Sequence, residues 1–439
     1  LLRQKYPSYA DLRYPPPLSI RQLQREVVDQ DEAILEFMVT RNRTYIFAID
    51  KRRFHAFSVD YPSNELEKDV EALTRPLHRA DTLASWDPSV AYRIYSKVIK
   101  PVEYFLVGKK AVVIVSHGPL TAVPFEILVS SESHAGKRFW SPKDKPDYLV
   151  EKYAFCYAPS AAALSNVRTR KRSHKPGWNL VAFGDAMYAA DEKAGELNPG
   201  AERLITACGI NSTGSKAGPL RSLPRTRKEI NEIARIVGSP AQVYFGPQAT
   251  ESLFKKADLT RYNYIHLATH GLLMSSPGKL HHQPAILFSL YGDHENDGFL
   301  QLGEVFGLKM NSDLVFVSSC LTPAAPHPSD TQGLMVLARA FLFAGTDAVI
   351  LGMWQVNDES TSKLFVETYR NLVHEPKAEA LRAGKLALLK NSATSHPYYW
   401  APFILIGNWQ ARPHPSTDKE DPEMVRFKGP ASWRKWLNM

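Results

Sequence analysis

The amino-acid sequence predicts an α/β fold built on a mostly parallel β-sheet, and two observations carry this prediction. From residue 178 onward, short apolar runs alternate with longer segments in which apolar residues recur every three or four positions. Strands that alternate with helices in this way are typical of parallel sheets. The short runs are also apolar at nearly every position, which indicates strands buried on both faces of a sheet.

The elements of this second part follow one another regularly. We expect strands at residues 178–186, 241–246, 262–271, 313–320, 346–354 and 402–408. We expect helices at residues 225–238, 250–259, 332–345 and 359–373. The first part is less regular and predicts an antiparallel meander, a helical stretch, two buried strands and a helix, at residues 32–60, 65–100, 110–118, 151–160 and 161–170. The charged, proline-bearing segment 168–177 between the two parts is the best candidate boundary.

The bulk composition excludes several classes of protein. A length of 439 residues predicts two or three domains, and no apolar run is long enough to span a membrane. Three cysteines, an odd and sparse number, indicate a reducing, cytoplasmic setting. The formal charge of +9 comes from scattered lysines and arginines, so direct nucleic-acid binding is unlikely. The opening residues, which begin with Leu1, resemble the middle of a longer protein.

Reactive side chains stand at the carboxyl ends of two expected strands. The strand at 262–271 finishes with His270 and Gly271, and the strand at 313–320 finishes with Cys320, 50 residues after His270. Ligands of open parallel sheets bind outside the carboxyl ends of the strands. A histidine beside a cysteine there can lower the thiol pKa and later protonate a leaving amine. The backbone N–H groups of Gly271 and Cys320 can form an oxyanion hole.

Plainer interpretations compete with this one. A lone cysteine at a strand end is usually a small buried apolar residue, and His266, four residues before His270, is expected inside the sheet. A rival pair, His117 and Cys156, is poorly placed because the strand continues past Cys156. His281 and His282 lack further metal ligands at suitable spacing, so no metal or organic cofactor is expected.

Four segments resemble the CHAT domain, a caspase-like and separase-like cysteine peptidase module that usually follows tetratricopeptide repeats. They are "YIHLATHG", "DGFLQLGEVFGLKMNSDLVFVSSCLT", "GLMVLARAFLFAGTDAVILGMWQVND" and "HPYYWAPFILIGNW", and the similarity covers roughly residues 30–410. The resemblance implies a caspase-like three-layer sandwich and a cysteine endopeptidase with a dyad of His270 and Cys320. Protein substrates and a regulatory protein partner are implied as well.

The resemblance also implies a domain organisation. We expect residues 1–30 to end an upstream helical repeat region or to be a linker, and residues 31–175 to form an inactive caspase-like half. Residues 176–410 are then the peptidase half, and residues 411–439 a C-terminal extension. "SSCLT" differs from the caspase pentapeptide around the nucleophile, so caspase specificity for aspartate is not assumed.

Members of the wider clan hold a basic side chain of the substrate with an acidic residue near the strand after the cysteine. Asp358 and Glu359 stand at that place, Trp354 can line a wall, and Asp330 is a weaker candidate, as is Gln332. Asp358 is equally suited to cap the helix that follows it. Two other functions stay open: a non-catalytic interaction scaffold with this fold, and, less favoured, association with nucleic acid through the basic surface.

Overall fold

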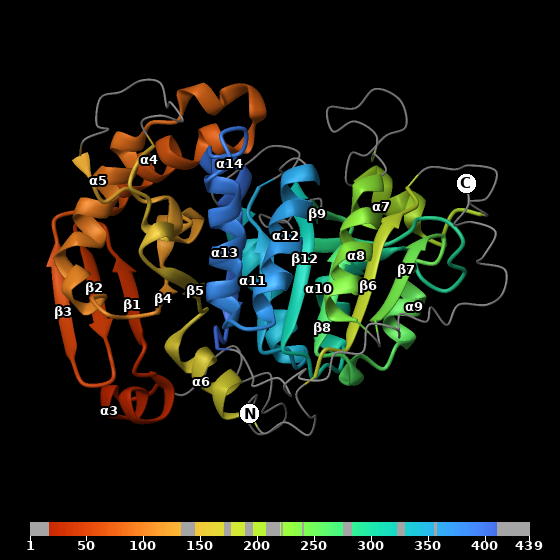
Figure 1. Ribbon diagram of the computed structural model, residues 1–439, viewed down its shortest axis with the longest axis horizontal. Coiled ribbons are helices and arrows are strands. Elements are labelled where there is room, and N and C mark those ends of the chain that lie inside the picture. Colours follow the sequence, from red (N-terminus) through yellow and green to blue (C-terminus); the bar gives the residue numbers. More distant parts are fainter. Residues whose placement is uncertain are drawn as a thin grey trace.

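The computed structural model describes residues 17–132, 145–170, 177–188, 196–207, 220, 223–238, 241–274, 283–322, 330–354 and 358–410. A single large sheet of 14 strands runs through these residues, with helices packed against it (Figure 1). The order along the main path is β11-β10-β9-β12-β13-β14-β5-β4-β1-β2-β3, and β8, β6 and β7 branch from β12. The α/β class and the mostly parallel pairing predicted from the sequence are confirmed.

The first part of the chain forms one end of the sheet. Three of its strands make the expected antiparallel meander, and two more continue the sheet in parallel: β1 Glu32–Val39, β2 Thr44–Ile49, β3 Phe54–Val59, β4 Ala111–Val115 and β5 Ala154–Tyr157. Its helices are α3 Ile20–Gln22, α4 Ser63–Thr74, α5 Pro88–Val98 and α6 Ala161–Thr169. The expected helical stretch at 65–100 is therefore two α-helices separated by short 3₁₀ turns.

The second part contributes the remaining strands. They are β6 Leu180–Ala186, β7 Ala241–Gly246, β8 Tyr264–Ala268, β9 His270–Met274, β10 Gln283–Leu287, β11 Phe299–Gln301, β12 Leu314–Thr322, β13 Ala348–Gly352 and β14 Phe403–Gly407. Its helices are α7 Ala201–Ala207, α8 Pro224–Val237, α9 Glu251–Lys256, α10 Leu302–Gly307, α11 Asp330–Ala344, α12 Asp358–Leu372, α13 Lys377–Leu389 and α14 Pro397–Trp400.

Helices cover both faces of the second part, which gives three layers. Ile230 of α8 packs onto Gly184 of β6, while the neighbouring Phe183 faces away and contacts Phe254 of α9 with ring centroids 5.5 Å apart. Because successive residues of a strand point to opposite faces, α8 and α9 lie on opposite sides of the sheet. Figure 1 shows α8, α12 and α13 side by side in front of it.

His266 belongs to β8, and its side chain is buried between the sheet and these helices, as predicted. Its side chain is fully buried, and Nε2 is 2.8 Å from Oε1 of Glu229 on α8. Its ring also packs against Phe365 and Tyr369 of α12. These contacts hold α8 and α12 against the strand that leads to His270. They account for the presence of His266 as a buried packing residue, without a catalytic role.

Strand β14 connects the two parts of the sheet. It pairs antiparallel with β13 and meets β5 at Ile406 and Tyr157. Two buried ion pairs add to this junction. Lys385 of α13 lies 2.5 Å from Glu126, which also accepts a hydrogen bond from Tyr157. Arg168 of α6 binds Glu32 of β1, and Glu32 also accepts a hydrogen bond from Trp409, two residues after β14.

None of the helices within the described residues has the length and apolar character needed to cross a membrane. The C-terminal extension expected at residues 411–439 lies outside the described residues.

Candidate active site

His270 stands at a break in the sheet rather than at the end of a strand. We expected one strand over residues 262–271, but β8 ends at Ala268 and β9 begins at His270 after a bend at Thr269. The break lets the two strands follow different partners. β8 pairs with β6 and β12, whereas β9 pairs with β12 and with the antiparallel strand β10.

The backbone of β12 brings Cys320 next to this break. Along its first half, β12 pairs in parallel with β8 from Leu314 to Val317, and at its end Leu321 lies opposite Gly271 of β9. Cys320 itself pairs with Gly352 of β13, after a register shift that follows Val317. The residues one position before the Leu321–Gly271 pair are Cys320 and His270, so their backbones are neighbours at this edge. The strand runs on to Thr322 instead of ending at Cys320, and the Cys320 side chain lies outside the described residues.

Tyr188 holds the first residue of β9 in place. The His270 backbone N–H donates to the Tyr188 hydroxyl over 3.0 Å, and that hydroxyl donates to the carbonyl of Leu287 over 3.3 Å. Leu287 is the β10 residue opposite His270, so the phenol bridges the two strands at the histidine. The rings of Tyr188 and His270 are also in contact, with centroids 4.8 Å apart. Burial raises the pKa of Tyr188 above its usual range, so the hydroxyl keeps its proton.

Asp358 is an acidic residue whose carboxyl group interacts electrostatically with His270. It is the first residue of α12, within an acidic first turn that also includes Glu359. Burial raises the pKa of Asp358 above its ordinary value, while the charges of His270 and Arg225 act in the opposite direction. A carboxylate here is favoured by the amino end of the helix. Because α12 begins at Asp358, the capping position before it lies outside the described residues.

Glu359 is engaged by its own chain. Its exposed carboxylate lies 2.6 Å from Arg225 and 2.9 Å from Lys363. Hydrogen bonds from Lys363 and from Arg225 lower the pKa of Glu359 to about 2. A basic substrate side chain would have to displace these partners, so Glu359 is the weaker of the two acidic candidates.

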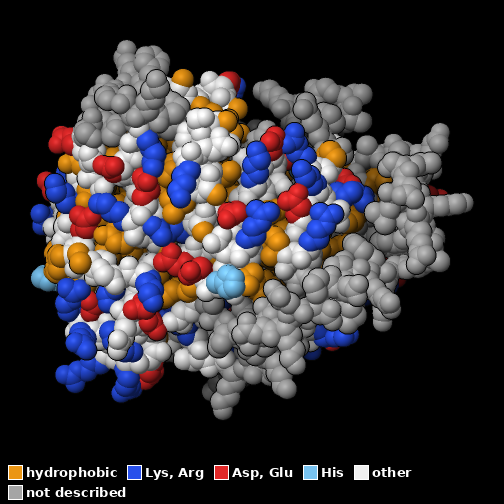
Figure 2. Space-filling model, in the orientation of Figure 1, with side chains coloured by type: hydrophobic (Ala, Val, Ile, Leu, Met, Phe, Trp, Pro, Cys, Tyr) orange, Lys and Arg blue, Asp and Glu red, His pale blue; other side chains and the backbone are white. Residues whose placement is uncertain are grey.

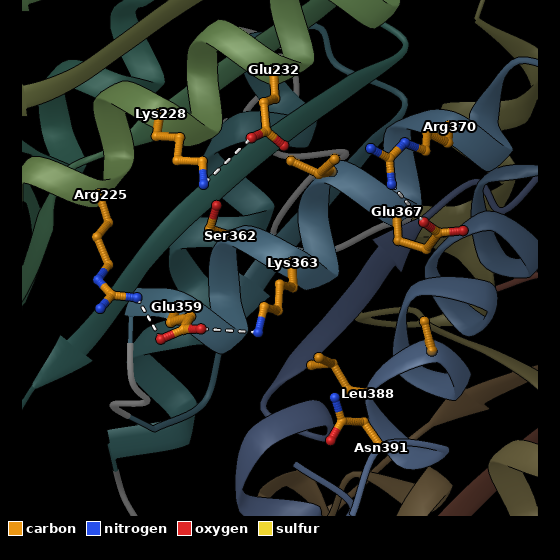
Figure 3. A pocket seen from close by; sticks show the side chains of 12 residues that line it. Arg225, Lys228, Glu232, Glu359, Ser362, Lys363, Glu367, Arg370, Leu388 and Asn391 are labelled. Atoms are coloured by element: carbon orange, nitrogen blue, oxygen red, sulfur yellow. Dashed lines mark hydrogen bonds and ion pairs between the residues drawn. The ribbon is translucent and has the colours of Figure 1, made fainter. Parts of the chain in front are cut away.

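Glu359 also borders a hollow of about 540 Å³ between α8, α12 and α13 (Figure 3). The charged side chains around it pair with one another across or along the helices: Arg225 and Lys363 with Glu359, Lys228 with Glu232, and Arg370 with Glu367. Each of these charged side chains has a partner of opposite sign, which is typical of a solvated helical surface, and only one positive charge is left in excess.

Trp354, the candidate expected to line a wall of the pocket, is buried. Trp354 is 2% exposed, and its Nε1 donates to the Tyr398 carbonyl over 3.1 Å. It therefore offers a substrate almost no surface in this structure. Asp330 is the first residue of α11, but its side chain and that of Gln332 lie outside the described residues, as do His281 and His282.

The rival pair does not form a site. Cys156 lies opposite Val113 of β4, four positions before His117, which corresponds to about 13 Å along a strand. Its side chain is fully buried, and Sγ donates to the Gly407 carbonyl over 3.0 Å. Burial raises the pKa of Cys156 to about 12. Cys156 is thus poorly placed for attack, as expected from the sequence.

This burial predicts the reactivity of Cys156. Because burial raises the pKa of Cys156 far above that of a free thiol, very little thiolate is present at pH 8, and iodoacetamide reacts with the thiolate. We expect Cys156 to remain unmodified in the folded protein and to react fully in guanidinium chloride, as measured by mass spectrometry of the peptides. Modification of Cys156 before unfolding would contradict its placement.

The visible face of the molecule carries mixed charge. Lys and Arg side chains are interspersed with Asp and Glu over the helices in Figure 2, and among the residues drawn in colour no area of one sign extends across this face. Such a surface gives little support to a nucleic-acid-binding face on this side.

The backbones of His270 and Cys320 are therefore neighbours at one edge of the sheet. The family model described as "CHAT domain" matches residues 89–408. The chain belongs to the CHAT domain family. The α/β sandwich and the mostly parallel sheet are those expected of this family. The identification made from the four sequence segments is thus confirmed.

Relatives of this CHAT domain include tetratricopeptide repeat protein 28 of Homo sapiens, which is 26% identical over 355 residues. The match covers 72% of the chain and 13% of that relative, and the protein of the same name from Mus musculus is 25% identical over 354 residues. The chain thus spans only a small part of the length of these relatives.

Two solved structures also align with this CHAT domain. The Saccharomyces cerevisiae separase–securin complex matches 88% of this chain and 31% of its own, with 9% identity and a TM-score of 0.49. The Arg-specific cysteine proteinase gingipain R matches 80% of this chain and 76% of its own, with 9% identity and a TM-score of 0.40.

Proposed function

We propose that this CHAT domain is a cysteine endopeptidase that cleaves a protein partner through His270 and Cys320. The observation that carries the proposal is the register of β12, because it makes Cys320 and His270 neighbours at the break between β8 and β9. Membership of the CHAT family supports it. In this proposal the strands β1–β5 belong to the inactive half, residues 31–175, and the strands β6–β14 to the peptidase half, residues 176–410.

The chemistry assigned to the dyad is acyl transfer. The Cys320 thiolate attacks the scissile carbonyl carbon, and the backbone N–H groups of Gly271 and Cys320 hold the oxyanion. The His270 imidazolium gives its proton to the leaving amine, which leaves an acyl-enzyme. His270 then takes a proton from water, the hydroxide displaces the thiolate, and the second product is released.

Asp358 has two possible contributions to this reaction. As a pocket residue, its half-buried carboxylate pairs with a basic side chain of the substrate. As a neighbour of His270, it stabilises the imidazolium. Both contributions are lost in Asp358→Asn, and they have different kinetic signatures.

Asp358→Asn is therefore expected to give one of two measurable results in a peptide assay. If the carboxylate reads the substrate, the preference for Arg or Lys over a neutral residue before the cut falls at least about 30-fold. If it serves the histidine, substrate preference is unchanged and the limb of the pH–rate profile that reports the imidazolium moves to lower pH. Glu359→Gln is the matched control and should change neither property. No change in either property would remove Asp358 from the site.

A second function, a protein-interaction scaffold, is favoured by one observation. The relatives found are named for tetratricopeptide repeats, and such repeats stack into extended concave binding surfaces. In this alternative the dyad is misaligned or blocked, and the fold serves to bind a partner. A regulatory protein partner and a cytoplasmic location fit both functions.

A thiol-directed probe separates the two functions. A peptidyl acyloxymethyl ketone is expected to label Cys320 covalently, and labelling should require His270. We would compare the intact protein with His270→Gln, and identify the labelled peptide by mass spectrometry. Failure to label Cys320, with or without a protein partner, would favour the scaffold.

A further inference from the structure

The strand β3 lies at one end of the large sheet and leaves a long edge open. Figure 1 shows it as the outermost strand of the first part of the chain. Among the described residues, β3 pairs only with β2, over all six of its residues from Phe54 to Val59. Four of those six residues are exposed to solvent, and Phe54 is 40% exposed.

The hairpin geometry shows which backbone groups of β3 point outward. In the turn before β3, the Asp50 N–H donates to the Arg53 carbonyl over 2.9 Å, so these two residues form a hydrogen-bonded pair. Hydrogen-bonded and non-hydrogen-bonded pairs alternate along an antiparallel ladder. The N–H and C=O groups of Phe54, Ala56 and Ser58 therefore point away from β2, and among the described residues they have no partner.

This edge lacks the features that usually keep strand edges apart. Within β3 there is no proline, no charged residue and no shift of register with β2. Natural proteins protect exposed edges with such features because a free edge is a template for pairing with another chain. An edge that is long, regular and unprotected is suited to form an interface.

We propose that β3 pairs antiparallel with β3 of a second copy of this chain, with Ala56 opposite Ala56 of the second copy. In this register all three outward-facing residues have hydrogen-bonded partners. Phe54 lies opposite Ser58 of the second copy, Ser58 lies opposite Phe54, and Ala56 lies opposite Ala56. The same register places the exposed Arg52 opposite the exposed Asp60 of the second copy, once on each side of the two-fold axis.

The charges favour a second copy over another occupant. The strand is preceded by Arg52 and Arg53 and followed by Asp60, so its two ends carry opposite charge. Antiparallel pairing of identical strands brings each basic end to an acidic end, and such opposite-charge pairs stabilise a sheet. In a two-fold symmetric dimer the same strand edge forms the interface on both copies, so no edge is left open at the contact.

Aromatic side chains on one face of β3 add contact area. The rings of His55 and Phe57 are stacked with centroids 4.3 Å apart, and Tyr104 meets Phe57 edge-on at 6.2 Å. In the proposed register His55 lies opposite Phe57 of the second copy in a non-hydrogen-bonded pair, where side chains approach most closely. Tyr104 is 48% exposed and lies beside this cluster.

Engineered cysteines test the register. In Ala56→Cys the two new thiols face each other across the axis with Cα atoms about 5.5 Å apart, within the range of a disulfide. In the control Ser58→Cys they are separated by about four residues along the strands, roughly 13 Å. We expect an oxidised dimer on a non-reducing gel for Ala56→Cys and no more than the wild-type amount for Ser58→Cys. Equal crosslinking of the two variants would overturn the register.

Charge reversal tests the dimer itself by sedimentation equilibrium. Arg52→Asp and Asp60→Arg are each expected to raise the dimer dissociation constant at least about tenfold, because like charges then face each other twice. The double variant should restore dimerisation, and Lys68→Asp, a change of the same kind on an exposed residue of α4, should leave it unchanged. A wild-type chain that stays monomeric at high micromolar concentration, or a dimer indifferent to these reversals, would overturn the proposal.

Discussion

Replacing Cys320 with alanine is expected to lower kcat/KM for a cleaved peptide by at least about a thousandfold. The thiolate supplies the electrons of the new bond, and no other cysteine of the described residues can take its place, because Cys156 is fully buried and its burial raises the thiol pKa. His270→Gln should cost a similar factor, since the imidazole both activates the thiol and protonates the amine.

The two changes should not add. Residues that act as a unit lose nearly the whole effect in the first substitution, so Cys320→Ala combined with His270→Gln should resemble either single variant. Cys156→Ser is the matched control, because a hydroxyl can still donate to the Gly407 carbonyl. Retained activity in Cys320→Ala, with the same products, would falsify the assignment of the nucleophile.

Replacing Lys385 with methionine is expected to lower the free energy of unfolding by about 3–5 kcal/mol. Lys385 is 1% exposed, and its partner Glu126 is 2% exposed, so the substitution leaves a carboxylate buried without its counter-charge. Burial lowers the pKa of Lys385, and the nearby Glu126 charge opposes that shift. The loss can be measured from the midpoint and slope of guanidinium unfolding.

The double variant separates the charge effect from packing. In Lys385→Met combined with Glu126→Gln, no buried charge remains, and the amide oxygen can still accept the hydrogen bond from Tyr157. We expect at least half of the lost stability to return, since replacing both members of a buried pair is often close to neutral. Equal destabilisation in the single and double variants would show that packing, and not charge, holds α13 at this junction.

The regular part of the fold was predictable because its strands are apolar at nearly every position. β6, β13 and β14 lie within the predicted ranges, α8 and α12 are each displaced by one residue, and β12 runs two residues past its predicted end. The hydrophobic pattern of residues 262–271 could not show the break at Thr269. The segment forms one apolar run, and that run would look the same whether or not it pairs with different neighbouring strands before and after Thr269. The hairpin of β10 and β11 and the helix α13 were missed for a related reason: their burial depends on neighbours that are distant in sequence.

The candidate site was predictable only in part. Two reactive residues at the ends of buried strands pointed to His270 and Cys320, because parallel strands end at a common edge. Tyr188 gave no signal, since a tyrosine two residues after a strand is common and its contact with His270 arises from tertiary structure. Trp354 was expected to line a pocket, but an indole that finds a backbone acceptor inside the protein is readily buried.

The central claim, that this CHAT domain is a peptidase, is tested most directly by the products it makes. The intact protein and Cys320→Ala would each be incubated with a proteome extract that contains candidate partners, and new amino termini identified by mass spectrometry. We predict cuts made by the intact protein alone, and the residue before the cut will decide whether Asp358 binds a basic side chain. No Cys320-dependent cut, even with upstream repeats and a binding partner supplied, would contradict the claim and favour the scaffold.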